Sequence, residues 1–130
     1  MPGLLDMKHL FLIIITAPQI CWSQADTIYY QNDSIKSIGI MDSNGRKGKW
    51  SYYYPSGVRS ATLNYKNDLL EGEQFYFHEN GKPAAQEMWV EGLQEDSSFY
   101  FYSNGELEKK GLFKEGLYEK QWEFGYENGQ

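Results

Sequence analysis

A 24-residue repeat runs through most of this chain and constrains its fold more than any other feature. Four glycines stand 24 residues apart, and each follows an aromatic segment and a short turn. The four segments are WSYYYPSG at 50–57, QFYFHENG at 74–81, SFYFYSNG at 98–105 and WEFGYENG at 122–129. Self-similarity at this period predicts a repeat array, in which each unit buries its apolar face only against its neighbours.

The repeat also predicts how the chain is divided. An aromatic column at Tyr65, Trp89 and Phe113 recurs at the same period, and a leucine column and a glutamate column follow it. Residues 26–47 match these columns weakly and are interpreted as a degenerate first copy. We therefore predict a repeat domain over 26–130, with units at 26–47, 48–71, 72–95 and 96–119 and a partial unit at 120–130.

Each unit has the composition of a β-hairpin. Its first strand is rich in tyrosine, phenylalanine and tryptophan, which favour pleated sheets. Asn80-Gly81 and Asn104-Gly105 tolerate the positive φ of tight hairpin turns, and a second strand follows each turn. No stretch holds an apolar 3.6-residue period between helix caps. We therefore expect an all-β fold: an antiparallel meander of about nine strands in one elongated, twisted sheet, about 40 Å wide.

The motif within these units resembles the bacterial variant of the MORN repeat. Its residues are Gly48, Trp50, Tyr53, Tyr54 and Gly57 in one copy and Gly72, Tyr76, Phe77 and Gly81 in the next. The resemblance covers 48–129 well and 26–47 weakly. It implies elongated sheets of β-hairpins that serve as binding scaffolds, and some members are proposed to contact phospholipids or to self-associate. Proteins of this variant are often labelled YwqK-type antitoxins of toxin–antitoxin systems.

The first 25 residues have the features of a secretory signal peptide. Lys8 and His9 precede a short apolar run at 10–15, and small residues follow near a polar boundary. The run is too short to span a bilayer comfortably, which argues against an uncleaved anchor. Met7 is a better start than Met1, because an acidic residue between them is out of place in a signal peptide. We therefore expect that the first six residues are a start-site artefact.

Two cleavage points fit the small residues near the end of this segment, one before Gln24 and one before Asp26. A lipoprotein signal at Cys21 is disfavoured, because Ile20 stands where a small residue is required. We therefore predict an exported protein in the periplasm, at the cell surface or in the medium, with no stable membrane insertion after cleavage.

Composition argues against several classes of function. The net charge is −6, which disfavours nucleic-acid and anionic-membrane partners, since both are bound mainly by cationic surfaces. One cysteine and two histidines exclude an internal disulfide framework and the common multi-cysteine or three-histidine metal sites. No phosphate-binding glycine loop and no nucleophile motif occurs. We therefore predict that the protein is not an enzyme and has no catalytic residues, no metal and no cofactor.

The first strands carry aromatic residues on both faces of the predicted sheet. We expect the face with Phe75, Phe77, Phe99 and Phe101 to be buried. The opposite face carries tyrosine and tryptophan, whose polar tips allow partial exposure. Exposed aromatic area usually marks a binding surface. The candidate ligand or partner contacts are therefore Trp50, Tyr52, Tyr54, Tyr76, Tyr100, Tyr102 and Trp122. The alternative is that these side chains pack on one another as cross-strand ladders.

Three further features bear on function. Glu71, Glu95 and Glu119 form a column that would hold a cation or lie in solvated turns, and the absence of a calcium-loop pattern favours the turns.

His78 lies in an aromatic column and is interpreted as a packed or surface residue rather than a catalytic base. The strand predicted at 121–126 is an open edge, which invites pairing with another chain.

These features favour a non-enzymatic, exported scaffold that binds a protein partner, or a second copy of itself, through its aromatic face or open edge. A second hypothesis is a carbohydrate-binding surface protein that stacks sugar rings on the tyrosine and tryptophan strip. A third is an antitoxin-like inhibitor, as the family resemblance implies. Cleavage of the leader would argue against the third hypothesis, which requires the domain to stay in the cytoplasm.

Overall fold

The computed structural model describes residues 24–125, without the side chains of 120–124. This part of the chain contains ten strands, where about nine were predicted, and no helix, as predicted. The strands are β1 (Asp26–Tyr29), β2 (Ile35–Asp42), β3 (Gly45–Tyr53), β4 (Arg59–Lys66), β5 (Leu69–Leu70), β6 (Gly72–Phe77), β7 (Pro83–Val90), β8 (Leu93–Phe101), β9 (Leu107–Lys114) and β10 (Leu117–Phe124). Most of the predicted signal peptide lies outside the described residues.

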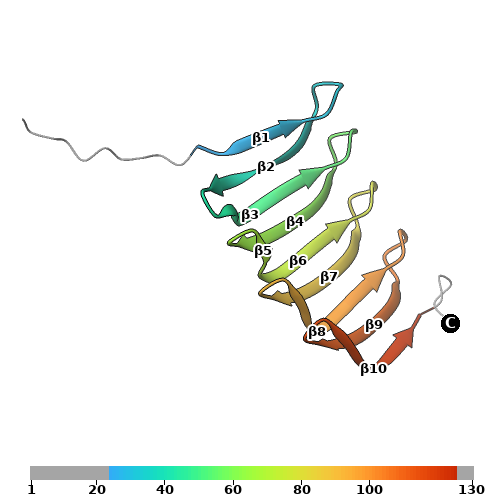
Figure 1. Cartoon of the computed structure of the whole chain (residues 1–130). Helices are drawn as coiled ribbons and strands as arrows, with labels where there is room; N and C mark the ends of the chain where they lie inside the picture. The colour runs from blue at the N-terminus through green and yellow to red at the C-terminus, as the bar shows by residue number, and fades with distance from the viewer. Residues whose placement is uncertain (1–23, 126–130) are drawn as a thin grey trace, which may run out of the picture.

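The strands form one open antiparallel sheet in which sequence neighbours pair (Figure 1). The order is β1-β2-β3-β4-β6-β7-β8-β9-β10, and the two-residue strand β5 folds back onto β4. The predicted meander is therefore confirmed. The sequence did not predict β5, which forms because the loop after β4 is long enough for two residues to return along it.

The connections lie at the ends of the strands and follow two opposite sides of the sheet (Figure 1). The edge that we call the hairpin edge carries the turns 30–34, 54–58, 78–82 and 102–106. The other, which we call the loop edge, carries the connections 43–44, 67–71, 91–92 and 115–116. On the hairpin edge Gly57, Gly81 and Gly105 have φ values of 88°, 81° and 97°, which other residues rarely adopt. This is why a glycine recurs every 24 residues.

The buried side chains lie on one face of the sheet, which we call the tyrosine face because Tyr52, Tyr76 and Tyr100 lie on it. They are Ser37, Trp50, Ala61, Tyr65, Gln74, Ala85 and Ser98. No second layer of described chain covers this face. The core is therefore a single row of side chains along the array, and each repeat packs mainly on its neighbours.

The other face carries Phe75, Phe77, Phe99 and Phe101 and is called the phenylalanine face. The prediction that it is the buried face is wrong, because the buried side chains of the described residues lie on the tyrosine face, and all four phenylalanine rings are only half-buried. The reason lies in the cross-strand neighbours. Phe75 and Phe99 both pair with Gln86, and Phe99 also pairs with Lys110. Long polar side chains keep their heads in water and leave the rings between them partly exposed.

Candidate binding face

Tyr52, Tyr76 and Tyr100 form a row across the tyrosine face, with a small residue between neighbours. Ala61 pairs with Tyr52 on one side and with Tyr76 on the other. Ala85 pairs in the same way with Tyr76 and Tyr100. The two alanines are only 7% and 8% exposed although the face is open, so the half-buried tyrosine rings cover them. The tyrosines stand two strand spacings apart, about 9.6 Å.

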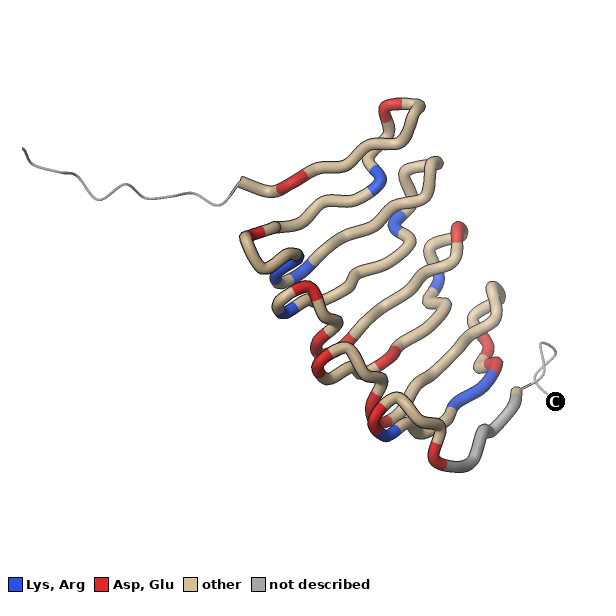
Figure 2. The backbone as a smooth tube through the Cα atoms, viewed as in Figure 1, with Lys and Arg blue, Asp and Glu red and all other residues tan. Residues whose placement is uncertain are grey.

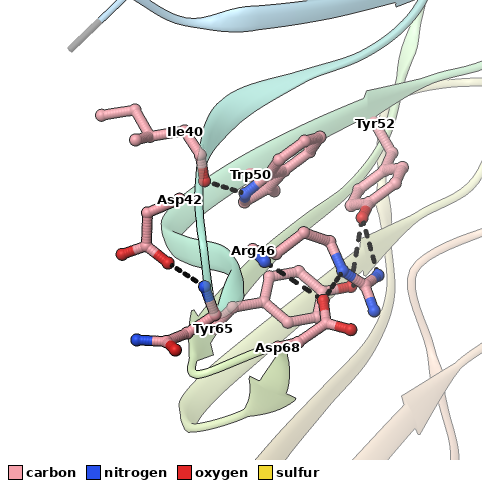
Figure 3. A network of polar contacts seen from close by, with 8 residues as sticks. Ile40, Asp42, Arg46, Trp50, Tyr52, Tyr65 and Asp68 are labelled. Carbon is pink, nitrogen blue, oxygen red and sulfur yellow. Dashed lines mark hydrogen bonds and ion pairs between the residues drawn. The ribbon is translucent and has the colours of Figure 1, made fainter.

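Trp50 lies beside this row and is 1% exposed. Its indole stacks on Tyr52 with ring centroids 6.2 Å apart and meets Tyr65 edge-on at 6.5 Å. Its Nε1–H donates to the backbone oxygen of Ile40 at 3.1 Å (Figure 3). A Cβ at Gly39 would overlap the indole, so the glycine makes room for it. Among the predicted contact residues, Trp50 is therefore placed for packing.

Arg46 holds the phenol tips at the N-terminal end of the row (Figure 3). Its Nε donates to Asp68 Oδ1 at 2.6 Å, and its Nη1 donates to the Tyr65 hydroxyl oxygen at 2.8 Å. The hydroxyl groups of Tyr52 and Tyr65 lie 3.1 Å apart. The hydrogen bond from Arg46 lowers the pKa of Asp68, whereas burial raises the pKa of Tyr65. The hydroxyl groups of both tyrosines therefore lie beside the ion pair of Arg46 and Asp68.

Farther along the row, Glu87 holds aromatic side chains by hydrogen bonds, as Arg46 does at the N-terminal end. One of its carboxylate oxygens accepts from the Tyr100 hydroxyl at 2.8 Å, and the other accepts from Trp89 Nε1 at 2.9 Å. Burial, followed by the negative charge of Glu87, raises the pKa of Tyr76 to about 12. The row therefore begins beside a cation and continues past an anion, and both charges hold its tyrosines.

Tyr54 and Tyr102, two further predicted contact residues, bind the next repeat at the hairpin edge. The side chain in this column hydrogen-bonds the backbone oxygen 23 residues later, an arrangement that we call the edge latch. The latches join Tyr30 to Tyr53 O (2.7 Å), Tyr54 to Phe77 O (2.7 Å), His78 to Phe101 O (2.8 Å) and Tyr102 to Gly125 O (3.2 Å). His78 can replace tyrosine in this column because its Nε2–H donates a hydrogen bond, as the hydroxyl group of tyrosine does. The structure shows His78 partly buried at this edge and hydrogen-bonded to the next repeat.

The glutamate column makes a similar connection along the loop edge. A carboxylate oxygen of Glu71 accepts from the backbone N–H of Glu91, and Glu95 accepts from that of Glu115, both at 2.7 Å. The column therefore ties one loop to the next. Within residues 24–119, no group of three or more histidine, cysteine, aspartate or glutamate side chains is arranged to hold a metal ion.

Two predicted features at the C-terminal end are only partly described. The side chain of Trp122 lies outside the described residues. Of the strand predicted at 121–126, residues 121–124 form the second half of β10, which pairs with β9 and, among the described strands, with no other, and residue 126 lies outside the described residues.

Several residues that hold the row are not among the predicted contact residues, chiefly Arg46, Tyr65, Glu87 and Trp89. The aromatic column at Tyr65 and Trp89 was a usable signal, because it recurs at the same period as the tyrosine row. Arg46 and Glu87 gave no such signal, since the residues 24 positions away from them are apolar. Only the cross-strand register brings these charges to the phenols.

The comparisons with known proteins agree with this architecture. Residues 46–67, 70–91 and 97–115 match a family model described as the MORN repeat variant. Each match covers most or all of one hairpin: β3–β4, β6–β7 or β8–β9. MORN repeats generally mediate interactions with proteins or lipids, and their family is non-enzymatic. No curated protein and no solved structure matches the chain. The described residues include no helix of the length and apolarity needed to cross a membrane.

Proposed function

Because this chain is a repeat protein of the MORN repeat variant family, we propose that it is an exported scaffold that binds a protein partner through its tyrosine face. The observation that carries the proposal is the row of Tyr52, Tyr76 and Tyr100, half-buried on a face that no second described layer covers. Tyrosine is enriched among the residues that dominate binding energy in protein interfaces. A partner laid across the array would cover the exposed parts of all three rings.

The row suits binding because hydrogen bonds already hold the hydroxyl groups of its tyrosines in place. The hydroxyl groups of Tyr52 and Tyr100 are hydrogen-bonded within the chain, to Tyr65 and Glu87 respectively. Side chains that are ordered before binding lose little conformational entropy when a partner arrives. Because these hydroxyl groups already have partners within the chain, a binding partner would contact chiefly the rings.

Charge favours a protein partner over a membrane surface. Acidic residues outnumber basic ones between 67 and 119, and Figure 2 shows them along the loop edge. Basic residues prevail only in the shorter stretch 35–66. Membrane leaflets that recruit peripheral proteins by charge are anionic and attract basic segments, so the net charge of −6 opposes such binding.

The start of the sheet is compatible with export. β1 begins at Asp26, the residue that one of the predicted cleavages would leave first. Cleavage there, or before Gln24, would remove no residue of any described strand. The mature chain would lack cysteine, and packing and the two edge connections would hold the array without a disulfide bond.

The test is a side-chain footprint of the complex. The full chain is cross-linked in its producing cells, the partner is identified by mass spectrometry, and the reconstituted complex is exposed to hydroxyl radicals. We expect the partner to protect Tyr52, Tyr76 and Tyr100 from oxidation. Tyr53 is the internal control, because the residue after Tyr52 on a strand points to the other face. Protection of Tyr53 with no protection of Tyr76 would show that the tyrosine face is not the binding surface.

A substitution series measures the same surface. Tyr76→Ala should weaken partner binding by about tenfold or more if the ring is a central contact. Tyr53→Ala removes a ring of the same size from the opposite face and should leave the dissociation constant within about threefold. Circular dichroism shows whether each variant keeps its sheet. Equal losses from both substitutions would contradict the proposed surface.

A further inference from the structure

An open hollow on the phenylalanine face, between β6, β7 and β8, has an acidic and apolar lining. Its volume is about 240 Å³, and its lining includes the carboxylates Glu73 and Asp96 together with Met88 and Phe99. Drug-sized ligands generally occupy pockets of about 300–1,000 Å³, so this one is the size of a single side chain. No lysine or arginine is among its described lining residues.

Two of the carboxylates are available to a ligand. One oxygen of Glu73 accepts from the side-chain amide of Gln86 at 3.2 Å, and one oxygen of Asp96 accepts from the backbone N–H of Ser97 at 2.7 Å. Each carboxylate has a second oxygen, and neither forms an ion pair within the described residues. Glu87 also contributes to the lining, but its two oxygens already accept hydrogen bonds on the tyrosine face.

We propose that this hollow binds an arginine side chain of the partner protein, an inference that rests on the scaffold function proposed above. A planar guanidinium group stacks on an aromatic ring and donates several hydrogen bonds in fixed directions, which suits a lining that combines Phe99 with two carboxylates. The methylene stem of arginine matches the apolar surface of Met88. A bare metal ion would gain nothing from these two apolar side chains.

The charge of the whole array supports the same partner chemistry. The hollow lies in the acidic part of the chain, beyond the basic stretch 35–66, and acidic residues line the neighbouring loop edge (Figure 2). A field of one sign attracts a segment of the opposite sign and raises its rate of association. A basic partner segment would therefore reach this half of the array first. The tyrosine row and the hollow lie on opposite faces, so the segment would reach around an edge or come from a second region of the partner.

The test uses N-acetyl-arginine amide as the probe and the ¹⁵N-labelled full chain. We expect its chemical-shift changes to centre on the backbone amides of Glu73, Gln86, Ser97 and Phe99. The citrulline analogue has nearly the same shape without the charge and should cause no localised changes. The lysine analogue should bind more weakly than arginine, because it lacks the planar fork. Changes spread over all acidic residues would overturn the proposal.

The matched variants remove charge while keeping the internal hydrogen bonds. In Glu73→Gln/Asp96→Asn each new amide oxygen can still accept from Gln86 or Ser97. We expect arginine binding to weaken by about tenfold or more, since two charge-assisted hydrogen bonds are lost. Glu79→Gln/Asp33→Asn changes the net charge equally at exposed positions in two turns of the hairpin edge, away from the hollow, and should change binding by less than about twofold.

Equal weakening by the two double variants would overturn the proposal in favour of a general attraction to the acidic chain. The outcome can be separated from that of the scaffold function, whose footprint is measured at the tyrosine row. If the partner protects Tyr76 and the arginine probe does not bind the hollow, the scaffold proposal stands and this one fails.

Discussion

The same position of the repeat is filled by an indole at Trp50 and by an amide at Gln74, and the two side chains are 1% and 0% exposed. Trp50 fills its place with ring contacts and one hydrogen bond to Ile40. Gln74 fills its place with hydrogen bonds: its Oε1 accepts from the backbone N–H of Asn64 at 2.7 Å, and its Nε2 donates to Gly72 O at 3.1 Å. Two unlike side chains thus serve one position.

The third copy of this position extends the comparison. Ser98 is also fully buried, and its hydroxyl oxygen accepts from Gln94 Nε2 at 2.7 Å. No described side chain leaves a buried nitrogen or oxygen without a hydrogen bond. The position therefore requires burial and satisfied polar atoms rather than a particular residue. The repeats do share two other features, the glycine of the hairpin turn and the edge latch.

The largest expected effect is the loss of stability when the indole of Trp50 is removed, and it is to be compared with the loss at Gln74. Trp50→Ala should lower the free energy of unfolding by about 3–5 kcal/mol, because a large cavity would open beside Tyr52 and Tyr65. Urea denaturation followed by circular dichroism measures the change. A loss smaller than that of the Gln74 variant below would mean that the indole is not the main packing element of its repeat.

The next effect tests whether Gln74 acts through hydrogen bonds. Gln74→Leu keeps a similar volume but leaves the backbone N–H of Asn64 and the oxygen of Gly72 without these partners, which should cost about 1–3 kcal/mol. Ser98→Ala removes one acceptor from Gln94 and should cost about 1 kcal/mol, as measured by the same urea titration. Equal or greater stability of Gln74→Leu would contradict the hydrogen-bond role.

The middle of the tyrosine row should lose stability in alkali, because it holds Tyr76 beside Glu87. Folding raises the pKa of Tyr76 to about 12 from an ordinary value of 10, so the folded chain favours the neutral phenol. This contribution is fully present below pH 10 and is lost as the pH rises from 10 to about 12. We expect a loss on the order of 1 kcal/mol after allowing for the half exposure of the ring.

Tyr76→Phe has no phenol at this position and should flatten part of that alkaline decline, which unfolding curves between pH 9 and about 12 would show. Glu87→Gln removes the negative charge beside the phenol and lowers the pKa of Tyr76, so the decline should still begin near pH 10 but be smaller and end at a lower pH. An unchanged profile in both variants would exclude Tyr76 as the group responsible.

The smallest expected effect concerns the edge latch. Tyr54→Phe removes one hydrogen bond to Phe77 O at a partly buried site and should cost about 0.5–1.5 kcal/mol. His78→Tyr exchanges one latch donor for another and should change stability by less than about 0.5 kcal/mol. Thermal unfolding of the two variants side by side measures the difference. A larger loss in His78→Tyr than in Tyr54→Phe would show that the column is not a set of equivalent donors.

The period, the turns and the meander could be predicted because each depends on local sequence. Gly81 and Gly105 mark their turns without knowledge of any distant residue. The buried face could not be assigned correctly, because both faces carry aromatic rings and the decision lies with their cross-strand neighbours. Ala61 and Ala85 let rings close over the tyrosine face, whereas Gln86 and Lys110 separate those of the phenylalanine face.

The candidate site was predicted only in part for a related reason. The tyrosine row follows the period and was recognised, but the partners of its hydroxyl groups do not repeat. Arg46 reaches Asp68 across 22 positions and Tyr65 across 19, and no pattern in the sequence links the three. The edge latch did leave a trace in the column Tyr30, Tyr54, His78 and Tyr102, whose shared feature is a donor at the tip rather than an aromatic surface.

The edge latch has an evolutionary consequence. Because each donor reaches an acceptor one repeat ahead, duplication of a complete 24-residue unit within the gene would supply every new donor with an acceptor. An insertion of half a unit would exchange the two edges and leave donors facing the wrong connections. The gene can therefore grow or shrink in whole units, and the protein lengthens in steps of about 10 Å while its existing contacts stay intact.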